Sequence, residues 1–150
     1  MSFSFGRRFG AVVSPLLAVA WALTYLYLGL TSSPPALPLG GRPDLVAHLG
    51  ASAVLAVLVA DALPGVGSSR WAAAAVLASL VGLAVEVFQT EVPNRDFDWL
   101  DLVTDAVGAI AGATVHRAAS FRLERRALSA TVTTIGVAAL TAAGLILLRF

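Results

Sequence analysis

The sequence contains no cysteine and no lysine, and charged residues make up only 13% of it. The absence of cysteine excludes disulfides and thiol catalysis, and it leaves the redox compartment undefined. A net charge of +1, with arginines spread thinly along the chain, argues against a nucleic-acid partner. Soluble domains usually contain about 25% charged residues. The scarcity of charge is therefore the first indication that this chain is not a soluble domain.

Hydrophobic residues supply 58% of the 150 residues, and the mean hydropathy is +0.85. A soluble core of this size would be too small to bury so much apolar surface. The apolar residues gather in segments close to the length of about 20 residues that crosses a hydrocarbon core of about 30 Å. These segments span residues 11–30, 45–63, 71–88, 99–115 and 127–148. The sequence therefore predicts an all-α integral membrane helical bundle of about five transmembrane helices, in a single domain over residues 1–150.

Two of the segments allow a second interpretation. Segment 99–115 is short and the most polar, so we expect either an interfacial outer turn, with Asp98 as N-cap and Trp99 at headgroup level, or a helix shielded by its neighbours. Segment 11–30 follows Arg7 and Arg8, as the apolar part of an export signal would. Its apolar run exceeds the about 7 to 15 residues of a signal peptide, so we expect it to be retained as a helix.

The arginines set the expected orientation, because the cytoplasmic loops of membrane proteins are enriched in basic residues. With a cytoplasmic N-terminus, the inner side carries Arg7, Arg8, Arg70, Arg117, Arg122, Arg125 and Arg126, and the outer side carries Arg42, Arg95 and Arg149. We therefore predict a multi-pass protein of the cell membrane with a cytoplasmic N-terminus and an extracytoplasmic C-terminus. This orientation places the start of the second segment, the end of the third and the start of the fourth at the outer membrane face.

Polar residues concentrate at that predicted outer face. A carboxylate within a membrane costs about 2.5 to 3.5 kcal/mol on insertion scales, so such groups persist mainly where they line a cavity, pair or bind something. Residues three, four or seven positions apart share one face of a helix, so each segment presents its polar residues as a stripe. The candidate ligand-binding residues are Asp44, His48, Glu86, Gln89, Arg95, Asp98, Asp101 and Asp105.

Glycines continue two of these stripes. Gly82 shares a helix face with Glu86, and Gly108 and Gly112 follow Asp105 at helical spacing. The pair in the fourth segment forms a small-xxx-small motif, which lets another helix backbone approach closely. We therefore expect the three glycines to pack helices together and to turn the carboxylates toward protein rather than lipid.

Several short motifs follow one another between residues 43 and 112. They are Asp44-x3-His48, Glu86-x2-Gln89, Pro93-Asn94-Arg95, Asp98-x2-Asp101 and the stretch from Asp101 through Asp105 and Gly108 to Gly112. This order resembles the VanZ-like membrane proteins, whose pattern is approximately D-K-x-x-H, E-x-x-Q, P-x-R, D-x-x-D-L and N-x-x-G-x-x-x-G. The chain departs from the pattern at Leu45, where the family usually has lysine, and at Asp105, where it usually has asparagine.

The resemblance implies a small polytopic helical protein of the cell envelope, and the family's namesake is associated with resistance to the glycopeptide teicoplanin. We expect the polar face to bind a membrane-lipid headgroup or a lipid-linked cell-envelope precursor. Arg95 would hold a phosphate or carboxylate, while the Asp and Gln side chains would bind hydroxyls or amines. We expect no cofactor and assign no metal ion, and the oligomeric state is left open.

Two other functions stay open. An enzyme acting on lipid headgroups would use Glu86, Asp101 and Asp105 with His48 to bind a hard divalent cation or to transfer protons. The sequence carries no recognised catalytic motif that favours it. An ion or proton conduit would need polar residues through the full membrane depth, whereas the inner halves of the segments look apolar.

Purely structural roles are the alternative for each residue taken singly. Glu86 and Arg95 would form an ion pair, Asp98 would only cap a helix, and His48 would be satisfied at the interface. Other polar or aromatic residues that we interpret as helix-end or packing residues are Tyr25, Asp61 and His116. The convergence of several stripes on one membrane face favours a binding site.

Overall fold

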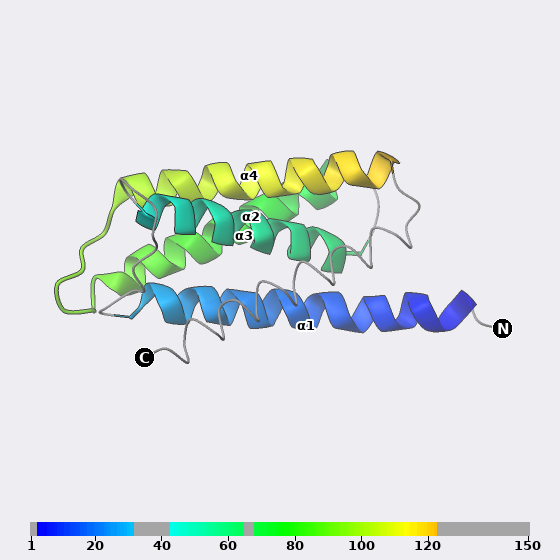
Figure 1. Cartoon of the computed structure of the whole chain (residues 1–150), viewed down its shortest axis with the longest axis horizontal. Coiled ribbons are helices and arrows are strands. Elements are labelled where there is room, and N and C mark those ends of the chain that lie inside the picture. The colour runs from blue at the N-terminus through cyan, green and yellow to red at the C-terminus, as the bar shows by residue number, and fades with distance from the viewer. Residues whose placement is uncertain (1–2, 32–42, 65–67, 123–150) are drawn as a thin grey trace.

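A computed structural model describes residues 3–31, 43–64 and 68–122. Within these ranges the chain forms α1 (Phe3–Gly29), α2 (Pro43–Ala62), α3 (Ser68–Gln89) and α4 (Trp99–Arg122). The helices lie side by side along the long axis of the molecule (Figure 1). The predicted all-α class is confirmed for the described residues, which contain no strand. The predicted segment 127–148 lies outside them.

The polar helix α4 begins where the sequence predicts but runs further. The Asp98 carboxylate accepts a hydrogen bond of 2.8 Å from the backbone N–H of Leu100, which caps the helix at its first turn. The helix has 24 residues and ends at Arg122, so the prediction of a short helix ending at Val115 was wrong. The polar residues after Val115 end the apolar run, but Ala118 and Ala119 favour continued helix.

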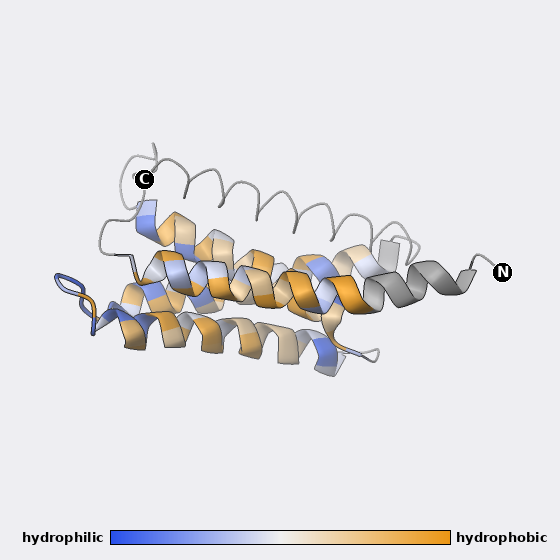
Figure 2. Ribbon diagram, turned by 90° about the horizontal axis from the view of Figure 1, so that it is seen from below, coloured by the Kyte–Doolittle hydropathy of each residue, from blue (hydrophilic) through white to orange (hydrophobic). Residues whose placement is uncertain are grey.

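Three of the described helices contain stretches long and apolar enough to cross a membrane, namely Val12–Gly29, Pro43–Ala62 and Ser68–Gln89. Figure 2 shows hydrophobic residues along the lengths of the helices. The large apolar side chains that point outward include Leu16, Val46, Leu80 and Ile110, one from each helix. Buried polar side chains lie inside the bundle. This arrangement, apolar outside and polar inside, suits a lipid surrounding and not water.

Helices α2 and α4 run in the same direction and approach closely at two glycines. A Cβ atom added to Gly108 would meet the backbone of Leu49, and one added to Gly112 would meet the backbone of Ala53. Both glycines therefore allow the close backbone approach that their spacing predicts. A Cβ atom on Gly82 of α3 would meet the side chain of Asp105, so this glycine makes room for a carboxylate.

Each helix passes through a polar, an apolar and a second polar layer. The apolar middle layer is built mainly of small residues: Leu55, Ala56, Ala78, Ala109 and Ala113. Helices α1 and α3 run opposite to α2 and α4, because Tyr25 contacts His48 while Ser14 contacts Asp61. The C-terminal ends of α1 and α3 therefore meet the N-terminal ends of α2 and α4, at the left in Figure 1. That end of the bundle holds the candidate site.

Candidate functional site

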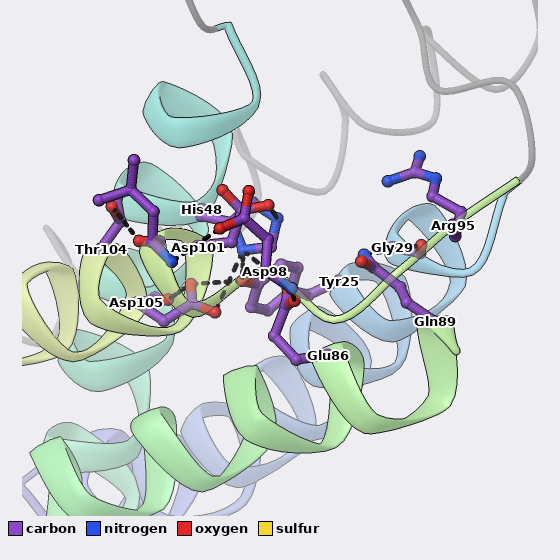
Figure 3. Close-up of polar contacts among 12 residues, drawn as sticks. Tyr25, Gly29, His48, Glu86, Gln89, Arg95, Asp98, Asp101, Thr104 and Asp105 are labelled. Atoms are coloured by element: carbon purple, nitrogen blue, oxygen red, sulfur yellow. Dashed lines mark hydrogen bonds and ion pairs between the residues drawn. The ribbon is translucent and has the colours of Figure 1, made fainter. Parts of the chain in front are cut away.

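A buried group of polar side chains from all four described helices occupies this end of the bundle (Figure 3). We call it the polar cluster, and its members are Tyr25, His48, Ser52, Glu86, Asp101 and Asp105. Glu86 and Asp105 are fully buried, while His48 and Asp101 keep 7% and 6% of their surface exposed. The cluster therefore lies just beneath the surface, with His48 and Asp101 nearest to it.

Asp105 is the most highly connected member. Its Oδ1 accepts hydrogen bonds from the hydroxyls of Tyr25 and Ser52, and its Oδ2 lies 3.1 Å from His48 Nδ1. Tyr25 gives its single hydroxyl hydrogen to Asp105, so its oxygen accepts from His48 Nδ1–H at 2.9 Å. These contacts place a hydrogen on Nδ1 of His48 and fix the orientation of the Asp105 carboxylate.

Glu86 is held on one side and left without a partner on the other. Its Oε2 accepts a hydrogen bond of 2.9 Å from the backbone N–H of Asp98, just before α4. Its buried Oε1 lies 3.9 Å from His48 Nδ1 and accepts no hydrogen bond within the described part of the chain. Burying a carboxylate oxygen without a hydrogen-bond partner costs free energy, so this oxygen is a candidate to bind a ligand, a proton or a cation.

The imidazole of His48 lies between carboxylates on both of its ring nitrogens. Asp105 and Glu86 approach Nδ1, and Asp101 Oδ2 lies 3.7 Å from Nε2. Glu86 and Asp105 carry two negative charges when ionised, and His48 carries at most one positive charge. The buried part of the cluster therefore favours a positively charged occupant.

Two of the predicted site residues donate hydrogen bonds to backbone carbonyls at the end of α1 and are not members of the cluster. Gln89 Nε2 donates to the carbonyl of Gly29 at 3.0 Å, and Arg95 Nη2 donates to the carbonyl of Thr31 at 3.1 Å. Figure 3 shows Arg95 set apart from the carboxylates. The ion pair between Glu86 and Arg95 that we considered from the sequence is not formed. Both contacts tie the end of α1 to the end of α3 and the loop that follows it.

The remaining predicted residues lie at the margin of the cluster. Asp98 caps α4 with its side chain and supports Glu86 through its backbone N–H. Asp44 is half-buried in the first turn of α2. Of the predicted candidates, the structure thus brings together His48, Glu86, Asp101 and Asp105, with Asp98 beside them.

Two members of the cluster, Ser52 and Tyr25, were not predicted as site residues from the sequence. Ser52 lies four residues after His48 and so shares its helix face, a spacing that could have identified it. Tyr25 is not merely a packing residue, because its hydroxyl bridges Asp105 and His48. No sequence motif marks Tyr25, since the register of α1 against the other helices depends on tertiary packing.

A second polar group occupies the opposite end of the bundle. Ser14 donates a hydrogen bond to Asp61, and Trp71 Nε1–H donates to His116 Nδ1 at 3.1 Å. His116 Nε2 then carries the ring hydrogen and lies 3.7 Å from Asp61 Oδ1. Asp61 lies at the end of α2 as predicted, whereas His116 lies within α4, so the interpretation of His116 as a helix-end residue was wrong. Because Ser14 and His116 are buried polar residues, the expectation of apolar inner halves was wrong as well. The described helices are apolar in the middle layer instead.

Comparison of the chain with protein-family models, with curated proteins and with solved structures finds no match.

Proposed function

We propose that the chain is a VanZ-like integral membrane protein of the cell envelope, whose polar cluster binds a lipid headgroup or a lipid-linked cell-envelope precursor at the outer membrane face. The observation that carries this proposal is the convergence of His48, Glu86, Asp101 and Asp105, from three helices, at one end of a bundle that is apolar outside. Buried carboxylates of this number are costly without an occupant or a partner.

The membrane setting is supported by the distribution of side chains. The described helices expose Leu, Val and Ile and bury Glu and Asp, which is unfavourable in water and favourable in lipid. The excess of arginines on one side of the predicted spans supports a cytoplasmic N-terminus. With that orientation, the polar cluster lies at the extracytoplasmic headgroup level, and the second polar group lies at the cytoplasmic level.

The charges of the site suggest which part of a headgroup each region contacts. The carboxylates of the cluster suit an amine or another cationic group. Arg95 lies on the loop between α3 and α4, at the same end of the bundle but apart from the carboxylates (Figure 3), and its guanidinium has further N–H donors besides the one that contacts Thr31. A phosphate is the natural partner for such a guanidinium. We therefore propose a headgroup that carries both a phosphate and a cationic group. By the resemblance, such binding would underlie a role in glycopeptide resistance.

The proposal can be tested by identifying the lipid that copurifies with the protein. Wild-type protein extracted in mild detergent should retain a phosphate- and amine-containing lipid or precursor detectable by native mass spectrometry, and Glu86→Gln should lose it. Asp61→Asn is the matched control, because Asp61 also faces a histidine but belongs to the second polar group. Equal lipid content in the wild type and Glu86→Gln, or no bound lipid in either, would contradict the proposal.

A further inference from the structure

Three donor groups of the polar cluster lie close enough together to hold a metal ion. His48, Glu86 and Asp105 each offer one donor atom, and these atoms lie within 4.8 Å of one another. First-row divalent ions hold nitrogen and oxygen ligands at about 2.0 to 2.2 Å, so neighbouring donors around such an ion lie about 3 to 3.5 Å apart. His48 Nδ1 already lies 3.1 Å from Asp105 Oδ2 and 3.9 Å from Glu86 Oε1. All three donor atoms lie within 4.8 Å of one another, so the Glu86 carboxylate would move toward the other two donors to enclose an ion.

Glu86 provides an independent indication of an occupant. Its Oε1 is buried and has no hydrogen-bond partner among the described residues, yet it faces the Nδ1 side of His48. A structural role for the carboxylate would require a donor at this position. A cation between Glu86 and Asp105 would satisfy this oxygen and would balance the charge that His48 alone does not balance.

Each of the three groups is also supported from behind, as metal ligands usually are. The hydroxyls of Tyr25 and Ser52 hold Asp105 Oδ1, and the backbone N–H of Asp98 holds Glu86 Oε2. Asp101 Oδ2 faces the opposite ring nitrogen of His48 at 3.7 Å. A carboxylate that accepts the other N–H of a ligating imidazole is the usual arrangement around protein-bound zinc.

We propose that His48 Nδ1, Glu86 Oε1 and Asp105 Oδ2 bind one first-row divalent cation such as Zn²⁺ or Mn²⁺, with Asp101 as a positioning residue. One imidazole and two carboxylates without a thiolate suit these ions. Binding requires that His48 lose the hydrogen on Nδ1 and carry it on Nε2, facing Asp101. The site deepens the proposed function, and its role there rests on that function. The ion would take the place of the headgroup's cationic group against Glu86 and Asp105, and three protein ligands would leave a position open on it for a phosphate oxygen beside Arg95.

The test uses the full-length protein in detergent, stripped with chelator and then dialysed against Zn²⁺ or Mn²⁺. Elemental analysis should find about one ion per wild-type chain. Glu86→Gln should retain none, and Asp101→Asn should bind the ion about 10- to 100-fold more weakly. Asp61→Asn should bind like the wild type, because its carboxylate faces His116 at the other end of the bundle.

Asp105→Asn would change a side chain that also accepts hydrogen bonds from Tyr25 and Ser52, so Glu86→Gln carries the comparison. As a second measurement, added ion should raise the melting temperature of the wild type but not that of Glu86→Gln. Wild-type protein without bound ion after dialysis, or equal binding by Glu86→Gln, would overturn the metal site. Lipid retention without metal would overturn the metal site alone, whereas metal binding without lipid would overturn only the headgroup function.

Discussion

Asp105 shows how much of the site depends on single atoms. Its two carboxylate oxygens have different partners, hydroxyls on Oδ1 and the His48 ring on Oδ2. The VanZ-like pattern that the sequence resembles usually has asparagine at this place, which would offer one oxygen and one NH₂ group. An aspartate offers oxygens on both sides, so this chain gains a second acceptor directed at His48.

Replacing Tyr25 with phenylalanine should destabilise the protein by about 1 to 2 kcal/mol, because the buried Asp105 and His48 would each lose a hydrogen-bond partner. Thermal unfolding in detergent measures the loss as a lower melting temperature. Tyr27→Phe is the matched control, since Tyr27 lies two residues away on the exposed side of α1. Equal melting temperatures for the two variants would show that the Tyr25 hydroxyl is not bonded as described.

The residues of the site could be predicted where helical spacing aligns them and where the predicted topology brings the ends of their helices to one membrane face. Glu86, Asp101 and Asp105 were found because buried carboxylates in apolar segments are costly and helical spacing aligns them. The sequence predicts Arg95 as a ligand residue but not the hydrogen bond that its guanidinium donates to the carbonyl of Thr31. That contact depends on how the end of α1 meets the loop after α3, and no local pattern encodes it.

For whole helices too, the sequence predicts local features but not which helices pack together, as α2 and α4 illustrate. The small-xxx-small spacing of Gly108 and Gly112 predicts that α4 has a close neighbour, but not that the neighbour is α2 at Leu49 and Ala53. The length of α4 was underestimated because hydropathy reports where a segment stops being apolar. A helix ends where its backbone hydrogen bonding ends, and α4 continues for several polar residues.

At the scale of these helices, Gly112→Ala should lower stability by about 1 to 3 kcal/mol, because its Cβ atom would meet the backbone of Ala53 and force α2 and α4 apart. Gly50→Ala is the control, since a Cβ atom there has nothing within 4 Å. That variant should be neutral or slightly stabilising, because alanine favours helix over glycine. Thermal unfolding measures both variants. A melting temperature of Gly112→Ala equal to or above that of Gly50→Ala would contradict the close approach of α2 and α4.

At the scale of the whole molecule, the four described helices together combine an apolar exterior with two polar ends and an apolar middle layer. The middle layer of Leu55, Ala56, Ala78, Ala109 and Ala113 separates the polar cluster from the second polar group. An ion or proton conduit through the described helices would have to cross this layer. Binding at one membrane face fits the arrangement better than conduction.

The orientation of the whole chain can be tested with reporter fusions. A reporter after Arg149 should be extracytoplasmic, and one between Arg117 and Arg126 should be cytoplasmic, because arginines favour the inner side. A cytoplasmic result for both fusions would mean that segment 127–148 does not cross the membrane. An inverted result for both would place the polar cluster at the inner face and contradict the proposed site of headgroup binding.

The central claim is that the polar cluster exists to bind and not to hold the bundle together. The most direct test measures the melting temperatures of the wild type, Glu86→Gln and Gly108→Leu, all treated with chelator. Glutamine keeps an oxygen for the Asp98 N–H and removes a buried charge beside Asp105, so Glu86→Gln should melt at or above the wild-type temperature. Gly108→Leu should melt well below it, because the side chain would collide with the backbone of Leu49. A loss of stability in Glu86→Gln as large as that in Gly108→Leu would contradict the claim.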